Sequence, residues 1–337
     1  MNSIAFSSFR CRKVAPYFRI REKSKQIAHV KENFYIMVNQ TEISSIGSVL
    51  NDVNRPLKER FRALFTLKNL GGQDAITEIS KAFTDKSELL KHELAYCLGQ
   101  MGDSLAIPAL VSVLEDLNQE PIVRHEAAEA LGAIGDQSVK ATLTRFRDED
   151  KEEVVRDTCK LAVERLVWLE KGQDENLSTN PYASTDPAPP STETDVEKLK
   201  ETLLNEKEGL FPRYRAMFAL RNLGSEESIL ALAQGLKAKN ALFRHEIAYV
   251  FGQMQSPLVT QHLIECLRNE DELDMVRHEC AEALGSIASD EVYEELSKYL
   301  NKSQPDVLRE SCVVALDFAD YERDTSEFQY ADTLSKV

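Results

Sequence analysis

The sequence has 337 residues, with 41 Lys and Arg against 56 Asp and Glu, so its formal net charge is −15. At about 150 residues per domain, this length predicts two domains that can each bury a core. A hydrophobic content of 42% with 29% charged residues excludes a largely disordered chain. No apolar run reaches the roughly 20 residues that span a bilayer, and the acidity argues against nucleic-acid binding, so neither a membrane nor a nucleic acid is an expected partner.

The first segment, residues 1–36, differs from the rest in charge. It holds eight basic and two acidic residues, a net charge of +6, which leaves −21 for the remainder. Its Ser and Arg content is typical of a mitochondrial transit peptide, and the alternative is a non-structural extension ahead of Met37. We favour the extension, because every repeat lies after Met37. Six cysteines without a CxxC pair indicate reduced thiols, so we predict a cytoplasmic or nuclear protein, with mitochondrial targeting as the alternative.

The rest of the chain is a duplication. RFRALFTLKNLG at 60–71 matches RYRAMFALRNLG at 213–224, and RHEAAEALGAIG at 124–135 matches RHECAEALGSIA at 277–288. The constant offset of 153 residues predicts two pseudo-symmetric lobes. A stretch rich in Pro, Ser and Thr between them is typical of a flexible linker, and the polar C-terminus is expected to fray. The predicted divisions are an extension (1–36), a lobe (37–171), a linker (172–194), a second lobe (195–321) and a tail (322–337).

A shorter repeat lies within each half. Blocks beginning at Phe61, His92, His125 and Asp157 are 31, 33 and 32 residues apart, a spacing typical of helical solenoids. Apolar residues within 127–134 recur at i, i+3, i+4 and i+7, which predicts an amphipathic helix. An apolar run precedes that helix, and a proline at its start separates the two. We therefore predict an all-α solenoid of eight antiparallel helix pairs, four in each lobe.

A His-Glu dipeptide recurs at one position of the four inner repeats. Four of the six histidines lie at this position, and each is followed by Glu. The outer repeats have other residues there, so the repeat fold does not require His-Glu, and we interpret the dipeptides as a functional site. They are His92-Glu93, His125-Glu126, His245-Glu246 and His278-Glu279.

The predicted geometry favours metal binding. Equivalent helices of neighbouring repeats stack with axes about 8–10 Å apart, so His92 and His125 can converge on one metal ion. His245 and His278 can do the same in the other half, which predicts a two-metal centre. Two imidazoles and a carboxylate with open positions are the ligands of non-haem iron oxygenases, but zinc and manganese accept the same donors. The residues alone do not identify the metal.

Two further positions recur on the same helix face. Glycine follows each histidine at i+7. Close helix packing explains it, as does an open lumen for a long substrate, and the two explanations are compatible. Glu129 and Glu282 lie at i+4 from two of the histidines. They either orient an imidazole or are exposed carboxylates of the repeat surface. The four glycines are Gly99, Gly132, Gly252 and Gly285.

From Met37 to Asp320 the sequence resembles the deoxyhypusine hydroxylase family. HELAYCLGQ, RHEAAEALG, FRHEIAYVFGQM and VRHECAEALG carry the resemblance, in order and on both sides of the linker. It implies a HEAT-repeat monooxygenase with two non-haem iron ions that uses O2. The implied protein substrate is the hypusine-containing eukaryotic translation initiation factor, whose deoxyhypusine side chain is hydroxylated. The resemblance also implies that His92, His125 and Glu126 hold one iron and His245, His278 and Glu279 the other, while Glu93 and Glu246 meet the cationic substrate arm or contact the metal.

The residues alone do not exclude two other classes of function. A HEAT-repeat scaffold without enzymatic activity, or a binding protein of the phycobilin-lyase repeat type, accounts for the repeats, the glycines and the acidity. Neither accounts for the restriction of His-Glu to the inner repeats. A di-metal hydrolase is the third interpretation, and the identity of the bound metal would separate it from an oxygenase.

Overall fold

The structure is a computed structural model that describes residues 40–172, 176–301 and 303–323. Within these residues it contains sixteen α-helices, five short 3-10 helices and no strand, so the all-α prediction is confirmed. No helix among them is long and apolar enough to cross a membrane. The predicted extension 1–36 lies outside the described residues, as does the predicted tail apart from the last residues of the final helix.

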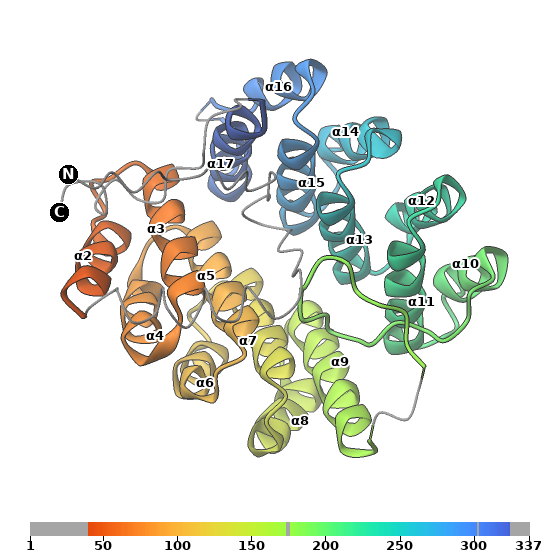
Figure 1. Cartoon of the computed structure of the whole chain (residues 1–337), viewed down its shortest axis with the longest axis horizontal. Coiled ribbons are helices and arrows are strands. Elements are labelled where there is room, and N and C mark those ends of the chain that lie inside the picture. Colours follow the sequence, from red (N-terminus) through yellow and green to blue (C-terminus); the bar gives the residue numbers. More distant parts are fainter. Residues whose placement is uncertain (1–39, 173–175, 302, 324–337) are drawn as a thin grey trace, which may run out of the picture.

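The helices form eight successive pairs, as the repeat spacing predicts. The first helix of each pair lies on the outside of the molecule and the second faces its centre (Figure 1). The outer helices are α2 (Gln40–Asn51), α4 (Gly72–Lys81), α6 (Ile107–Glu115), α8 (Lys140–Glu149), α10 (Val196–Leu204), α12 (Glu226–Ala233), α14 (Thr260–Arg268) and α16 (Asp290–Ser297). The inner helices are α3 (Leu57–Leu70), α5 (Glu88–Met101), α7 (Pro121–Ile134), α9 (Glu153–Glu170), α11 (Leu210–Leu223), α13 (Ala241–Met254), α15 (Asp274–Ile287) and α17 (Asp306–Arg323).

The inner helices close into a ring (Figure 1). At one junction the Ser87 hydroxyl, just before α5, donates a 2.6 Å hydrogen bond to Glu310 on α17. At the other, the Asn240 amide, just before α13, donates a 2.6 Å bond to Asp157 on α9. These two contacts occupy equivalent positions of the duplication. The solenoid is therefore closed at both junctions. The boundary between the two predicted lobes stays a prediction.

Buried arginines fix four of the outer helices against their inner partners. The Nε atom of Arg124, on α7, donates a 3.1 Å bond to the Leu114 carbonyl near the end of α6. The last carbonyls of a helix lack partners within the helix, so this bond satisfies a group that would otherwise be buried unpaired. Arg124 immediately precedes His125 and therefore also sets the position of that histidine. The same bond recurs in three other repeats, from Arg60 to Leu50, Arg213 to Leu203 and Arg277 to Leu267.

Three of the four recurrent glycines are packing positions. A Cβ on Gly99 would lie 2.7 Å from the Cα atom of Ala130 on the next inner helix, which is far inside van der Waals contact. Gly132 and Gly285 meet alanines of the next helix in the same way, at 2.8 and 2.7 Å. Close helix packing therefore explains the glycines at these three positions.

The segment between α9 and α10 contacts both halves of the ring. Figure 1 shows it reaching from the rim toward the centre. The Thr185 amide donates a 2.9 Å bond to Gln100 on α5, and Arg221 on α11 donates bonds of 2.9 and 2.6 Å to Asp186. Ala188 is 1% exposed. The prediction of a flexible linker came from composition and did not foresee these contacts.

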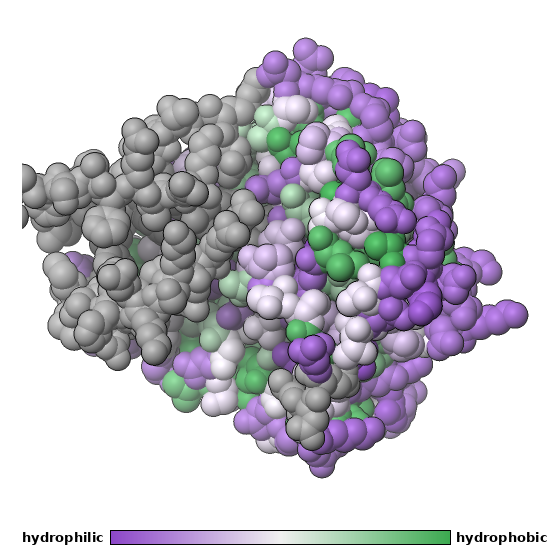
Figure 2. Space-filling view, turned by 45° about the vertical axis from the view of Figure 1, so that its right-hand side comes forward, coloured by the Kyte–Doolittle hydropathy of each residue, from purple (hydrophilic) through white to green (hydrophobic). Residues whose placement is uncertain are grey.

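The surface follows the same inside–outside division. Figure 2 shows a rim that is mostly hydrophilic, with hydrophobic residues concentrated further in. The buried residues of successive helix pairs form one continuous hydrophobic core that runs around the ring. This core holds the inner helices in register, and the inner helices carry the histidines.

Candidate metal centre

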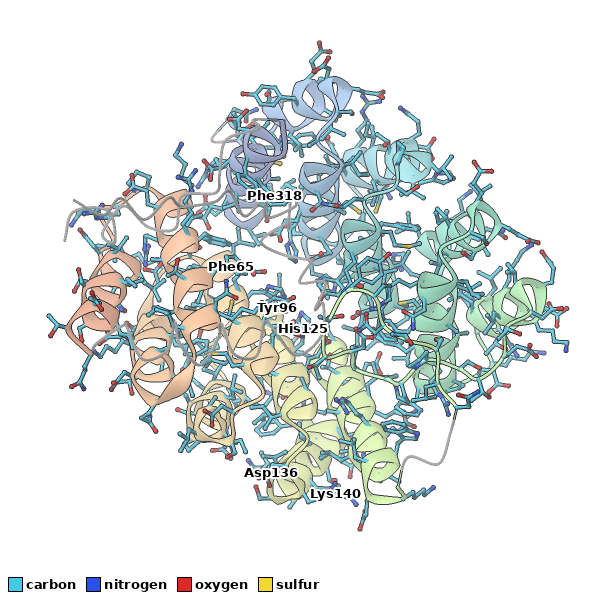
Figure 3. All side chains as sticks on the ribbon, viewed as in Figure 1. Phe65, Tyr96, His125, Asp136, Lys140 and Phe318 are labelled. Carbon is cyan, nitrogen blue, oxygen red and sulfur yellow. The ribbon has the colours of Figure 1, made fainter. Side chains whose placement is uncertain are left out.

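Four histidines meet in one layer at the centre of the ring. Each lies in the second turn of its inner helix, on α5, α7, α13 and α15, and all are at most 5% exposed. Figure 3 labels His125 among the side chains at the centre. The ring centroids are 5.5 Å apart for His92 and His125, 5.4 Å for His245 and His278, and 5.3–5.9 Å for three of the pairs that cross between the halves.

The imidazole nitrogens of these four histidines are unsatisfied. Neither ring nitrogen of any of the four has a hydrogen-bond partner among the described residues, although all are buried. Buried polar groups in folded proteins are almost always bonded, and leaving one unpaired costs about 1–3 kcal/mol. Eight unpaired donors or acceptors in one layer are therefore costly for the chain alone. Coordination of metal cations would satisfy one nitrogen of each ring, so the residues present fit a metal centre.

The glutamates of the dipeptides surround this layer. Glu126 approaches the Nε2 atom of His92 at 3.3 Å, while Glu93 approaches the Nδ1 atom of the same ring at 3.4 Å. In the other half, Glu279 lies 3.5 Å from the Nε2 atom of His245. All four glutamates are at most 4% exposed. The two glutamates nearest His92 therefore face its two different nitrogens.

Three clusters of these side chains have ligand atoms within 4.8 Å of one another. One unites His245, His278 and Glu279, the complete ligand set expected for the second metal. The set expected for the first metal is divided between two clusters that share His125. These are His92 with His125 and His245, and His125 with Glu126 and Glu129.

The electrostatics of the centre oppose charge on its carboxylates. Burial raises the pKa of Glu93 to about 7, and it holds the pKa values of Glu246 and Glu279 well above the ordinary 4.5. Burial likewise lowers the pKa of His125, with further lowering by the neighbouring histidines. For His92 burial acts in the same direction, but the carboxylates of Glu126 and Glu93 prevail and raise its pKa well above 6.5. A bound cation would supply the positive charge that these carboxylates need in order to ionise.

The layer opens into a narrow pocket. Sequence reasoning missed two of its lining residues, Tyr96 and Tyr249, although each lies at i+4 from a histidine and the two are separated by the offset of the duplication. Glu129 and Glu282 also line the pocket. Glu282 is buried, and its Oε1 lies 3.6 Å from Nδ1 of His278, too far for a hydrogen bond. Neither glutamate is thus a carboxylate of the outer repeat surface.

Curated relatives match almost the whole described chain. Deoxyhypusine hydroxylase of Drosophila pseudoobscura pseudoobscura is 56% identical over 302 residues, which cover 89% of this chain and 99% of the relative. The human deoxyhypusine hydroxylase is 54% identical over 302 residues, 89% of this chain and 98% of its own. The chain belongs to the deoxyhypusine hydroxylase family.

A solved structure and two repeat families agree with membership of the deoxyhypusine hydroxylase family. The structure of human deoxyhypusine hydroxylase in complex with glycerol superposes with a TM-score of 0.81 at 53% identity, covering 86% of this chain and 99% of that one. HEAT repeats match residues 106–164, and the PBS lyase HEAT-like repeat matches 90–116, 212–238 and 276–302. The expected HEAT-repeat solenoid is thus confirmed, and the chain is an enzyme of this family with side-chain clusters suited to a metal.

Proposed function

We propose that this enzyme is a deoxyhypusine monooxygenase that acts on the hypusine-containing eukaryotic translation initiation factor. The observation that carries the proposal is the central layer of four buried, unbonded histidines in a chain 54% identical to human deoxyhypusine hydroxylase. A scaffold or lyase-like binding protein would have no use for eight unsatisfied imidazole nitrogens in its core. The cost of burying them favours an enzyme that fills the site with metal.

The proposed cofactor is a pair of non-haem iron ions. His92, His125 and Glu126 would hold one, and His245, His278 and Glu279 the other. The approach of Glu126 and Glu279 to Nε2 atoms supports this division. Zinc and manganese accept the same donors, but hydroxylation of an unactivated C–H bond requires a redox-active metal, and bound iron would supply the activation of O2.

Glu93 and Glu246 are the proposed partners of the ammonium groups of the substrate arm. Glu93 faces Nδ1 of His92, on the side away from Glu126. One carboxylate oxygen of each, Oε2 of Glu93 and Oε1 of Glu246, is buried without a hydrogen bond among the described residues. An ammonium group from the substrate would satisfy these oxygens and favour their ionised form. Together they would hold the arm at the metal layer and keep water out.

The protein substrate and the location complete the proposal. The arm is cationic, and the chain beyond residue 36 carries a net charge of −21, so attraction assists the encounter. Five described cysteines are free, which supports a cytoplasmic or nuclear location. The tagged full-length chain and a tagged chain that begins at Met37 should both remain outside mitochondria. Mitochondrial import of the full-length chain would contradict this location.

Metal reconstitution tests the function. The purified metal-free protein is loaded with Fe(II), with Zn(II) or with no metal, and each sample receives the deoxyhypusine-bearing factor in air. We expect about two irons per chain by atomic absorption. Hydroxylated product, detected by mass spectrometry, should appear only with iron and oxygen. His262→Ala, on the outer helix α14, is the matched control and should keep both metal and activity, whereas His125→Ala should lose both. Hydroxylation by the zinc-loaded or metal-free protein would overturn the proposal.

A further inference from the structure

A second layer of side chains lies beneath the histidines. On α5, His92, Tyr96 and Gln100 follow at intervals of four residues, so they lie on one face about one helical turn, or 5.4 Å, apart. His245, Tyr249 and Gln253 repeat this order on α13. Tyr96 and Tyr249 belong to the lining of the pocket, and the two glutamines do not. The glutamines therefore lie beyond the tyrosines when viewed from the histidine layer.

The two tyrosines meet across the pocket. Their hydroxyl oxygens are 3.1 Å apart, a hydrogen-bond distance, and their ring centroids are 6.0 Å apart in a T-shaped arrangement. Both rings pack against the hydrophobic core and are half-buried. The pair thus forms a bridge between α5 and α13. Figure 3 places Tyr96 near the centre of the ring.

The linker lies behind this bridge. The backbone of Thr185 exchanges two hydrogen bonds with the Gln100 side chain, at 2.9 and 3.1 Å. The Ser184 hydroxyl accepts a 2.9 Å bond from Gln253. Residues 184–186 therefore contact equivalent glutamines on opposite sides of the ring. They lie across the end of the ring toward which the inner helices run, which leaves the other end for the approach of a substrate arm.

A polar network fixes the tyrosine bridge in place. Arg221 is fully buried, and it donates to Asp186 of the linker and, at 2.8 Å, to Oε1 of Gln253. Arginine can only donate, so this contact orients the amide with Nε2 toward the Tyr249 hydroxyl, 3.3 Å away. The bridge is therefore held from behind by an ion pair and an oriented amide. A side chain that pressed on it from the metal layer would meet a supported surface.

We propose that Tyr96 and Tyr249, supported by linker residues 184–186, form the floor of the arm pocket and select the substrate arm by its length. The inference rests on the proposed function. The reacting carbon of deoxyhypusine lies between two amines, so when it is held at the metal layer one amine lies toward the mouth and the other toward the floor. An additional methylene on the floor side would push the terminal ammonium into the tyrosine hydroxyls. A rigid floor would reject the lengthened arm. A shorter arm would not bring its terminal ammonium within reach of the tyrosine hydroxyls.

A series of arm lengths tests the floor. The protein substrate is prepared with aminopropyl, aminobutyl or aminopentyl arms on the same lysine. Binding to the metal-free protein is measured by calorimetry, and kcat/KM is measured with the iron-loaded protein. Tyr249→Ala opens the floor, Tyr249→Phe removes only the bridging hydroxyl, and Asp186→Asn weakens the linker support. Tyr214→Phe is the matched control, because this buried tyrosine donates a 3.3 Å bond to the Leu242 carbonyl and does not line the pocket.

The expected result is a change in selectivity. A single methylene in a fitted pocket is discriminated by about 10-fold or more, so Tyr249→Ala should shift the aminopentyl-to-aminobutyl ratio by about 10-fold toward the longer arm in both measurements. Tyr249→Phe and Asp186→Asn should shift it less in the same direction, and Tyr214→Phe should leave it unchanged. Folded, metal-competent Tyr249→Ala with the native ratio would overturn the inference. If that variant does not fold, an unchanged ratio in Tyr249→Phe would do so. If the iron-loaded native protein does not hydroxylate the substrate with the aminobutyl arm, the proposed function itself is refuted.

Discussion

Arg62 on α3 donates hydrogen bonds of 3.2 and 2.7 Å to Asp317 on α17, although 255 residues separate them in the sequence. This two-pronged ion pair joins the first inner helix to the last. Lys58 adds a second positive charge 3.5 Å from the same carboxylate. The contact matters for the site because a ring that opens here would separate α5 from α15, and each carries one histidine of the central layer.

Removing the charge of Asp317 should loosen this junction. A partly buried, bidentate arginine–carboxylate pair contributes about 1 kcal/mol, so Asp317→Asn should lower the melting temperature by about 2 °C. Thermal unfolding followed by circular dichroism measures the shift. Asp148→Asn is the control, because that exposed carboxylate pairs only with its neighbour Arg147 in the described structure. Equal melting temperatures for the two variants would mean that the junction contributes nothing to stability.

The metal-free protein should lose stability as the pH rises from about 6.5 to 8. Burial raises the pKa values of Glu93 and Glu282 from 4.5 to about 7, so the folded state holds protons that the unfolded state has released. Stability therefore falls as the pH rises through 7, by about 1 kcal/mol for each group over this window. The buried His125, with its lowered pKa, acts in the opposite sense, but only below about pH 6.5, where the unfolded imidazole is protonated.

Chelator-treated protein unfolded thermally at pH 6.5 and pH 8 gives the measurement. Restoring the metal should reduce or reverse the loss, because metal ions bind the deprotonated ligands. A metal-free protein that is more stable at pH 8 than at pH 6.5 would show that these carboxyl groups are ionised in the folded state.

The sequence predicted the helix pairs and the histidine layer because both depend on local, repeated patterns. The repeat spacing places His125 at the same position of its helix as His92, and duplication copies that position to His278. Ring closure was not predicted, because the meeting of Arg62 and Asp317 depends on curvature accumulated over eight pairs. The ion pair between Asp186 and Arg221 was missed for a different reason. The linker that holds Asp186 has a composition typical of unpacked chain, and only the buried Arg221 opposite it reveals a partner.

The packing role of the recurrent glycines leads to a third prediction. A Cβ on Gly285 would lie 2.7 Å from the Ala315 carbonyl oxygen and 2.8 Å from its Cα atom, and neither backbone atom can move easily. Overpacking of this kind costs about 1–3 kcal/mol, while the higher helix propensity of alanine returns about 1 kcal/mol. Gly285→Ala should therefore unfold at a lower urea concentration. Gly209→Ala, whose Cβ would meet nothing closer than 3.9 Å, should stay near the native midpoint. A native midpoint for Gly285→Ala would favour the lumen.

The last prediction separates the four glutamates of the dipeptides, which look equivalent in the sequence. Glu126 faces Nε2 of His92 at 3.3 Å and Glu93 faces Nδ1 of the same ring at 3.4 Å, so one metal bound at Nε2 can be reached by Glu126 and not by both. Glu126→Ala should thus strip iron as thoroughly as His125→Ala. Glu93→Ala should retain most of its iron and lose the substrate, because removing one partner of a buried ion pair costs about 3–5 kcal/mol. Iron per chain by atomic absorption and capture of the deoxyhypusine-bearing factor measure the two effects. If Glu93→Ala loses as much iron as Glu126→Ala, both carboxylates are metal ligands, and the arm must be held by other groups of the pocket.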